Sequence, residues 1–365
     1  MIKINNIIKE LEKLAPPVLQ ESYDNAGLIV GDKNEEVKGI LVSLDTTEEV
    51  IQEAIDTNSN LIISHHPIVF SGLKSITGKN YIERVIVKAI KNNISIYAIH
   101  TNLDNVFDGV NKKIADRLGL DDLKILSAKK SSLIKLSVFV PKAAVNGVKD
   151  ALFEAGAGNI GNYSHCSFSS TGMGSFKANE NADPYVGEKN KLHIEEELKI
   201  EVVLPSHLQS KVVSSLLNSH PYEEVAYDLF PLLNKSKQIG SGMVGKLKEE
   251  MDESSFLTFL KEKMKTNCIR HSKLLNKKIR KVAFCGGAGD FLLESAIAQN
   301  ADVFISGDFK YHRFFDAENK LVILDIGHFE SEQFTIDLLV DFLKEKFSTF
   351  AIRFTEVNTN PINYF

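Results

Sequence analysis

Apolar and helical segments alternate over the first hundred residues. Residues 39–45 (GILVSLD), 61–64 (LIIS) and 94–100 (ISIYAIH) are short and apolar almost throughout, which is typical of buried strands. Residues 46–58 and 81–93 lie between them and carry apolar side chains at helical spacing. Apolar strands that alternate with helices predict a mainly parallel sheet covered by helices.

The two ends of the chain extend this pattern. Residues 2–17 predict a short amphipathic helix that ends at Pro16 and Pro17. Near the other end, the pattern predicts buried strands at 281–285, 301–306 and 321–326 and helices at 291–300 and 332–347. We therefore expect both ends to be parts of one α/β layer.

The middle of the chain has a different pattern. Its expected segments are strands at 133–140 and 198–205, which alternate apolar and polar positions, a helix at 144–156, and a loop at 171–193. This combination predicts a small antiparallel α+β domain. We expect it to span residues 131–244, inserted between two halves of an α/β domain at 1–130 and 245–365.

Composition excludes several classes of protein. The 365 residues are 43% hydrophobic and 25% charged, as in globular proteins, and no apolar run suits a signal peptide or a membrane span. A cytoplasmic location is the expectation. The net charge of -5, with scattered Lys and Arg, gives no nucleic-acid signal. Cys166, Cys268 and Cys285 lie far apart, so we expect reduced, mostly buried thiols.

Imidazoles and carboxylates recur where the predicted strands end. In open parallel sheets, ligands bind outside the carboxyl ends of the strands, because loops and helix amino termini surround a crevice there. The residues at these ends are Asp45, His65, His66, His100, Asp104, Asp308, Lys310, His312 and His328. We expect a polar site at this edge.

His65 and His66 follow one buried strand directly. Neighbouring side chains in a strand face opposite sides, but Pro67 ends the strand and lets the chain turn both imidazoles into the crevice. The plainer alternative is a pair of loop histidines with surface hydrogen bonds. Their place at the end of a buried strand favours the site.

Two further segments supply carboxylates. Asp104 follows the strand at 94–100, where the alternative role is an Asx-turn or a helix cap. If a helix begins near Gly327, His328 and Glu332 lie one turn apart on one face, whereas Glu330 points elsewhere. The alternative for these acids is a helix amino terminus that complements the macrodipole.

Three imidazoles and two carboxylates without thiolate suit Zn, Mn or Fe(II). Five ligands are many for one zinc ion that keeps an open position, but they suit two ions about 3.5–4 Å apart. Two dications against two carboxylates leave the site positive. We therefore expect it to favour a bound hydroxide and an anionic small-molecule substrate.

Five more strand-end residues are candidates for support or proton transfer: Asp45, His100, Asp308, Lys310 and His312. Metal-bound histidines usually donate their other nitrogen to a carboxylate or carbonyl, and Asp45 is positioned to accept. Each of the five, taken singly, has a structural alternative. As a group, one or two are expected to serve the site.

Two glycine-rich segments resemble phosphate-binding loops. Gly240, Gly242 and Gly245 fit G-x-G-x-x-G, but their place at the return from the inserted domain favours a hinge or a tight strand crossing. Residues 285–290 (CGGAGD) follow a strand and precede a helix, yet lack the Lys and Ser or Thr of a P-loop. A tight strand-to-helix turn is the expectation there.

Seven segments in order resemble one family of dinuclear-metal proteins. They are YDNAGLIVGD (23–32), SLDTT (43–47), SHHPIVFSGLKSI (64–76), AIHTNLDN (98–105), HPYEEVAYDLFPL (220–232), SGDFKYH (306–312) and GHFESE (327–332). The chain resembles the GTP cyclohydrolase I type 2 family, also called the NGG-interacting-factor-three-like family, over nearly its full length.

The resemblance implies a toroidal homohexamer with two metal ions per subunit. It places the metal ligands on His65, His66, Asp104, His328 and Glu332. It also implies an inserted domain similar to the PII and CutA folds, of ferredoxin-like type, with residues 220–232 near its end. Zinc is the expected metal, with Mn or Fe as alternatives.

Two functions follow from the sequence. The first is a metal-dependent hydrolase acting on a nucleotide, phosphate ester or related molecule, with the metal ions stabilising a developing oxyanion. The second is a metal-binding regulator or scaffold whose inserted domain senses a ligand or docks a partner. Replacement of His66 or Glu332 by Ala should abolish activity only in the first.

Overall fold

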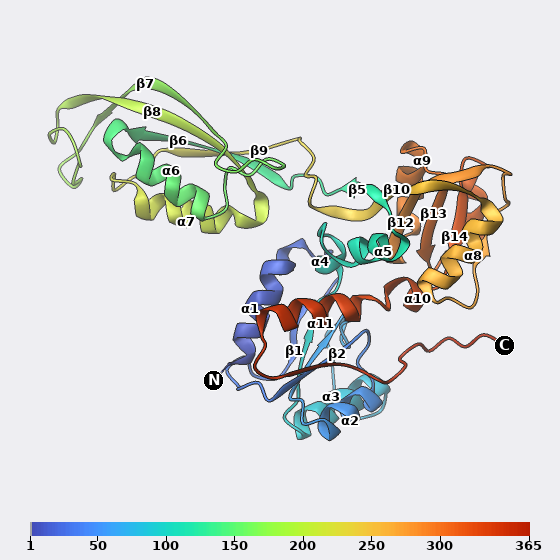
Figure 1. Cartoon of the computed structure of the whole chain (residues 1–365). Helices are drawn as coiled ribbons and strands as arrows, with labels where there is room; N and C mark the ends of the chain where they lie inside the picture. The colour runs from blue at the N-terminus through green and yellow to red at the C-terminus, as the bar shows by residue number, and fades with distance from the viewer. Residues whose placement is uncertain (1) are drawn as a thin grey trace. The chain divides into compact units, whose positions relative to one another are not determined.

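Three β-sheets organise residues 2–365, the part of the chain that the computed structural model describes (Figure 1). Two of the sheets belong to a unit formed by residues 2–128 and 238–365, and the third belongs to a unit formed by Lys129–Lys237. The structure is therefore a mixed α/β fold with several sheets and helices, as the hydrophobic pattern predicts.

The first sheet has the strand order β1-β4-β3-β2-β15. Its strands are Gly27–Val30 (β1), Gly39–Ser43 (β2), Leu61–Ser64 (β3), Ser95–Ala98 (β4) and Ala351–Phe354 (β15). β15, β2, β3 and β4 pair in parallel, and β1 is antiparallel to β4. The helices between the strands are α2 (Glu48–Asp56) and α3 (Tyr81–Lys91). The predicted strand and helix order of this part is confirmed.

Helices cover both faces of the first sheet. Leu41 and Ile62 pack with side chains of α2 and α3, whereas their neighbours Ile40 and Ile63 pack with α1 (Ile4–Leu14) and α11 (Thr335–Lys346). This alternation follows from the two-residue period of a strand. Figure 1 shows α1 and α11 on one side of β1 and β2 and the helices α2 and α3 on the other.

The second sheet has the order β11-β14-β13-β12-β10-β5. Its strands are Asp121–Ala128 (β5), Gly240–Asp252 (β10), Arg270–His271 (β11), Lys278–Ala288 (β12), Val303–Gly307 (β13) and Val322–Asp325 (β14). β12, β13 and β14 are parallel, and the remaining pairs are antiparallel. The expectation of one layer from both ends is wrong, because the late strands pair with each other and only β15 joins the first sheet.

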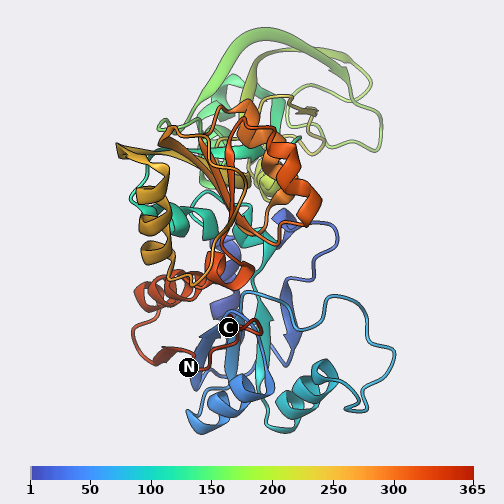
Figure 2. The same cartoon turned by 90° about the vertical axis from the view of Figure 1, so that its right-hand side faces the viewer.

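The helices around the second sheet lie on its two faces. α5 (Val110–Leu118) and α8 (Glu253–Met264) contribute to the core cluster that also includes α1 and α11, and α9 (Leu293–Ala298) packs on the opposite face. Figure 2 shows α8 in yellow-orange and α9 in orange on opposite sides of this sheet. The same unit also contains two short helices, α4 (Thr101–Asp104) and α10 (His328–Glu332).

The inserted unit has the element order of the ferredoxin-like motif, βαββαβ. Its elements are Leu133–Pro141 (β6), Val145–Glu154 (α6), Ser167–Lys177 (β7), Leu192–Pro205 (β8), Gln209–Ser219 (α7) and Tyr227–Pro231 (β9). The sheet order is β7-β8-β6-β9, with every neighbouring pair antiparallel. Apolar side chains of the sheet pack against α6 and α7.

Two local expectations differ from the structure. Residues 171–177, expected in a loop, belong to β7, because a long antiparallel partner strand supplies their hydrogen bonds despite the glycines. The segment from Gly240 to Gly245, expected to be a hinge or strand crossing, begins β10, which pairs with β5 and β12. The compact unit formed by Lys129–Lys237 ends shortly before this segment.

Residues 2–365 contain no helix with the length and apolar character needed to traverse a bilayer. Cys166, Cys268 and Cys285 are free thiols; Cys285 is buried and the other two are half-buried.

Candidate metal centre

His65 and His66 leave the end of β3 with their rings directed to one place. The backbone N–H of His65 donates to the carbonyl of Ser43, the last residue of β2, at 3.1 Å, and that of His66 donates to Leu44 at 2.9 Å, so both residues extend the parallel pairing. The Nδ1 of His65 donates to the carbonyl of Ile99 at 2.8 Å, and the Nδ1 of His66 is 2.8 Å from Asp45 Oδ1. These contacts hold the rings 4.9 Å apart and leave both Nε2 atoms for the site.

Helix α10 brings His328 and Glu332 to the same place. Gly327 adopts a positive φ of 94°, and the helix starts at the next residue. One turn of helix sets the imidazole and the carboxylate on one face, with His328 Nε2 3.2 Å from Glu332 Oε2. The same oxygen is 3.0 Å from His66 Nε2, whereas Oε1 faces His65 Nε2 at 3.7 Å.

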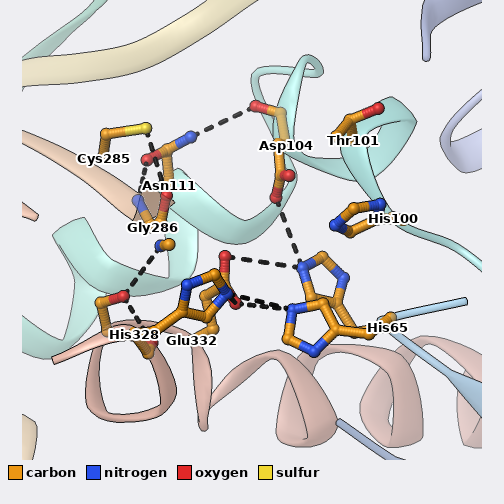
Figure 3. A network of polar contacts seen from close by, with 12 residues as sticks. His65, His100, Thr101, Asp104, Asn111, Cys285, Gly286, His328 and Glu332 are labelled. Carbon is orange, nitrogen blue, oxygen red and sulfur yellow. Dashed lines mark hydrogen bonds and ion pairs between the residues drawn. The ribbon is translucent and has the colours of Figure 1, made fainter. Parts of the chain in front are cut away.

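Asp104, the last residue of α4, approaches His65 from the other side. Figure 3 shows its carboxylate directed at the His65 ring, opposite Glu332 and His328 on α10. The distance between Asp104 Oδ1 and His65 Nε2 is 3.6 Å. Both atoms are buried and have no hydrogen-bond partner. Buried polar atoms without partners are costly, so this pair lacks an interaction that a bound cation can supply.

The structure thus brings together all five residues that the sequence singles out. Their ligand atoms form two groups within 4.8 Å: His66 with His328 and Glu332, and His65 with Asp104 and Glu332. A third group of the same kind joins His65, His66 and His100. Histidine and carboxylate groups that could hold a metal ion are therefore present, and Glu332 belongs to two of these groups.

Protons balance the charges of this cluster. Burial opposes a charged His66, but hydrogen bonds to Asp45 and Glu332 outweigh it and raise its pKa to about 10. Burial likewise opposes a charged His328, but its bonds to Asp308 and Glu332 raise its pKa to about 11. A divalent cation bound here replaces these protons, since metal-bound imidazole is neutral.

The two carboxylates shift in opposite directions. Burial alone would raise the pKa of Glu332, but its close contacts with His328 and His66, together with the nearby His65 ring, hold that pKa well below its ordinary value. Burial, and then the charge of Glu332, raise the pKa of Asp104 well above its ordinary value. The surroundings therefore favour the charged form of Glu332 and the protonated form of Asp104.

The glycine-rich end of β12 has a packing role at the site. Gly287 has a φ of +62°, and a Cβ there would lie 2.4 Å from Glu332 Oε1. Its backbone N–H donates to Ser331 Oγ at 2.8 Å, and the N–H of Gly286 donates to Asn111 Oδ1 at 3.1 Å. These glycines therefore let β12 approach Glu332 closely. Residues 285–288, expected in a tight strand-to-helix turn, still belong to that strand.

Three carboxylates support the imidazoles. Asp45 holds His66, Asp308 Oδ2 is 2.7 Å from His328 Nδ1, and Asp24 Oδ1 is 2.7 Å from His100 Nδ1. Asp45, His100 and Asp308 were expected near the site. Asp24 was not singled out, although it lies in the segment 23–32, because a turn residue before an edge strand carries no periodic signal.

Lys310 and His312 have a different position. Both side chains are exposed, and the His312 ring lies edge-on to Tyr311 and tilted against Phe315 in a 3-10 helix at Tyr311–Ala317. Among the described residues, neither forms an ion pair or hydrogen bond with the five candidate ligands. Asp308 has a φ of +59°, and the chain turns there before it reaches them.

A pocket of about 610 Å³ opens over the cluster. Its wall includes His66, His100, His328 and Glu332, the aromatic rings of Phe70 and Phe291, and residues 359–362 of the carboxyl-terminal segment. Thr359 Oγ1 donates to Asp45 Oδ2 at 2.8 Å, and Asn360 Nδ2 donates to Glu330 Oε1 at 3.1 Å. These tail residues were not expected at the site, because a segment without secondary structure has no sequence pattern.

Known proteins resemble this chain over its full length. It is 40% identical to the GTP cyclohydrolase 1 type 2 homolog of Halalkalibacterium halodurans, over 98% of both chains, and 38% identical to that of Bacillus subtilis, over 98% of this chain and 97% of the relative. The crystal structure of a Bacillus cereus protein related to NIF3 matches with a TM-score of 0.87 and 38% identity, over 100% of this chain and 99% of that one.

The family model described as Duf34/NIF3 (NGG1p interacting factor 3) matches residues 2–361. The motifs around the two histidines, Asp104 and Glu332 thus lie within a match that spans both units. This chain belongs to the Duf34/NIF3 family.

Proposed function

We propose that the chain is a metal-dependent hydrolase whose centre holds two divalent ions. The observation that carries this proposal is the position of Glu332, whose Oε2 faces His66 and His328 while its Oε1 faces His65. A carboxylate that presents one oxygen to each of two ligand groups suits a bridge between two cations. A single ion would need only one of these two ligand groups, so the presence of both supports two ions.

One ion is assigned to His66, His328 and Glu332, and the other to His65, Asp104 and Glu332. Imidazole and carboxylate ligands without thiolate suit zinc, which we propose as the native metal, and also Mn and Fe(II). When bound, such ions would supply Lewis-acid chemistry, which activates water and stabilises negative charge on a substrate.

The residues of the chain orient the ligands and move protons. Asp45 and Asp308 each accept from an Nδ1–H, which fixes the tautomer that leaves Nε2 of His66 and His328 free to bind. His100 lines the pocket with its Nδ1 on Asp24. We assign to His100 the transfer of a proton to or from the reacting group, because its imidazole lines the pocket and Asp24 fixes its orientation.

The substrate is proposed to be a small anion, such as a nucleotide or a phosphate ester. Two dications opposite Glu332 and Asp104 leave an excess of positive charge, which favours an anion. Phe70 and Phe291 line the same pocket and offer apolar surface to a ring system. The name of the relatives, GTP cyclohydrolase 1 type 2 homolog, makes GTP the first compound to test.

The test combines metal analysis with turnover. The chain loaded with Zn, Mn or Fe(II) is assayed with GTP, other nucleotides and phosphodiesters, and we expect two metal ions per chain and metal-dependent product formation. His66→Ala and Glu332→Gln should lose both. His312→Ala replaces an exposed histidine outside the pocket and serves as the matched control.

Two results would contradict parts of this proposal. A content of one ion per chain refutes the bridging role of Glu332. Two ions without turnover of any compound refute the hydrolase and favour the metal-binding regulator or scaffold.

The assembly is a separate proposal. We infer a toroidal homohexamer and a PII- or CutA-like inserted domain from the motif resemblance, supported for the insertion by its βαββαβ order. Light scattering of the purified chain should return six times the mass of the monomer. A monomeric mass would contradict it.

A further inference from the structure

The inserted unit contains a pocket of its own, with a volume of about 640 Å³. It lies on the face of the four-stranded sheet opposite α6 and α7, which Figure 1 shows on one side of that sheet. Leu198 and Ile200 of β8 pack toward the helices, so the alternating residues Glu197 and Lys199 face the other way, into the pocket.

Glu197 forms the floor of this pocket. The residue is only 9% exposed, yet its carboxylate forms no ion pair with a Lys, Arg or His of the described chain, and its polar neighbour is the Tyr222 hydroxyl. Its cross-strand neighbour is Gly172, and a Cβ added to Gly172 would have no atom within 4 Å. A Cβ on Gly174 would lie 2.1 Å from Glu197 Oε2. The two glycines therefore create the hollow and seat the acid.

Tyr222 stands beside Glu197 and is held by His220. His220 Nε2 donates to the carbonyl of Phe139 at 2.9 Å, and its Nδ1 accepts from the backbone N–H of Tyr222 at 3.1 Å. The Tyr222 hydroxyl is buried without a completed hydrogen bond. Burial, and then the neighbouring Glu197, raise the pKa of Tyr222 above its ordinary value, so the phenol keeps its proton.

Aromatic rings form the side of the pocket. The Tyr222 ring lies 6.1 Å from that of Phe176 and 6.2 Å from that of Tyr185. Lys199 also lines the pocket, but its ammonium is 2.9 Å from Glu201 Oε1, which neutralises it. The pocket therefore combines flat apolar surface with a negative floor, which favours a planar ligand with N–H donors over an anion.

We propose that this pocket binds a flat group with two adjacent N–H donors, such as a guanine edge or a guanidinium, whose donors meet the two oxygens of Glu197. Paired N–H groups match a carboxylate in a bidentate, charge-assisted contact, and the aromatic wall stacks on the plane. This site is independent of the metal centre and of the hydrolase proposed there. It also gives His220 and Tyr222, in the segment 220–232, a role in positioning and contact.

The test measures binding of guanosine and, separately, of arginine to the full chain by equilibrium dialysis, with adenosine as the comparison compound. Guanosine represents a free heterocycle and arginine a guanidinium from a peptide, so the two arms identify the source. We expect one of them to bind with a Kd of about 1 mM or tighter. Adenosine lacks the pair of adjacent donors and should bind at least about tenfold more weakly.

Two variants locate the site. Glu197→Gln keeps the shape and removes the charge, and Gly172→Leu fills the hollow at a strand position with open space around it. Each should weaken binding at least about tenfold. The matched controls are Glu196→Gln, an exposed neighbour on the same strand, and Gly147→Leu, an exposed open position on α6; both should bind as the parent chain does.

Several results would overturn the proposal. The first is that neither guanosine nor arginine binds at about 1 mM. The others are that adenosine binds as tightly as guanosine or arginine, or that Glu197→Gln binds with the affinity of the parent chain. Binding is also measured after metal removal by a chelator. The same affinity supports a site separate from the metal centre, whereas its loss overturns that separation.

Discussion

Replacement of Gly287 by Ala tests whether the glycine-rich end of β12 positions the carboxylate of Glu332. The added Cβ would lie 2.4 Å from Glu332 Oε1 and 3.3 Å from His328 Cε1. Glu332 cannot swing aside freely, because its side chain is buried and its other oxygen is held 3.0 Å from His66 and 3.2 Å from His328. The substitution should therefore displace the carboxylate of Glu332 or the backbone at Gly287.

The magnitude has two parts. An L-residue in the left-handed region costs roughly 1–2 kcal/mol. Overpacking of a buried contact adds about 1–3 kcal/mol. Gly119→Ala is a matched control, because Gly119 also has a φ of +62° but a Cβ there would meet nothing within 4 Å. The control should lose only the backbone part.

The assay follows urea unfolding of the metal-free chains by circular dichroism and metal binding by titration. The free energy of unfolding of Gly287→Ala should be lower than that of Gly119→Ala by the overpacking contribution. Only Gly287→Ala should also lose metal affinity. The reasoning is refuted if the two variants unfold alike and Gly287→Ala retains the metal affinity of the parent chain.

Three further predictions concern the ligands, the pH and the metal. Asp45→Asn should reduce metal affinity by about 10–100-fold in a titration, because the partner of His66 Nδ1 changes; unchanged affinity would contradict that support. Hydrogen bonds from the Thr77 backbone and hydroxyl, and from the Lys79 backbone, lower the pKa of Glu83 from 4.5 to about 2, so its contribution to stability is fully present above pH 4.5 and is lost as the pH falls toward 2. Hydrogen exchange should show the loop before α3 opening across this range in the parent chain, and Glu83→Gln should show an open loop at pH 7 as well; equal protection in both chains at pH 7 would refute the role of Glu83. Free metal at 100 times its Kd should stabilise the chain by about 2.7 kcal/mol, so chelation should lower the thermal midpoint; an unchanged midpoint would mean that the centre binds no metal in the folded state.

Several features of the fold follow from local patterns. The apolar runs at 39–45, 61–64 and 94–100 predict the strands β2, β3 and β4, because a strand buried on both faces needs apolar side chains at every position. These strands are parallel neighbours in one sheet, so the residues after their carboxyl ends, including Asp45, His66 and His100, gather at one edge. The spacing of His328 and Glu332 similarly predicts one helical face.

Other features depend on contacts between distant segments. Glycines in β7 and at the start of β10 suggest loops when read locally, but their partner strands supply hydrogen bonds that no local pattern reveals. Lys310 and His312 follow β13 in the chain, as His66 follows β3, yet a left-handed Asp308 turns the chain so that both are exposed. Asp24 and Thr359 reach the site from irregular segments.

The sequence by itself determined which residues end the strands and which lie on one helical face, because period and turn chemistry act over a few residues. Only the tertiary structure decided that His65 and His66, from the first sheet, meet His328 and Glu332, beyond β14 of the second. That meeting depends on a core shared by α1, α5, α8 and α11, whose contacts join residues hundreds of positions apart. Packing over such separations leaves no periodic trace in the chain.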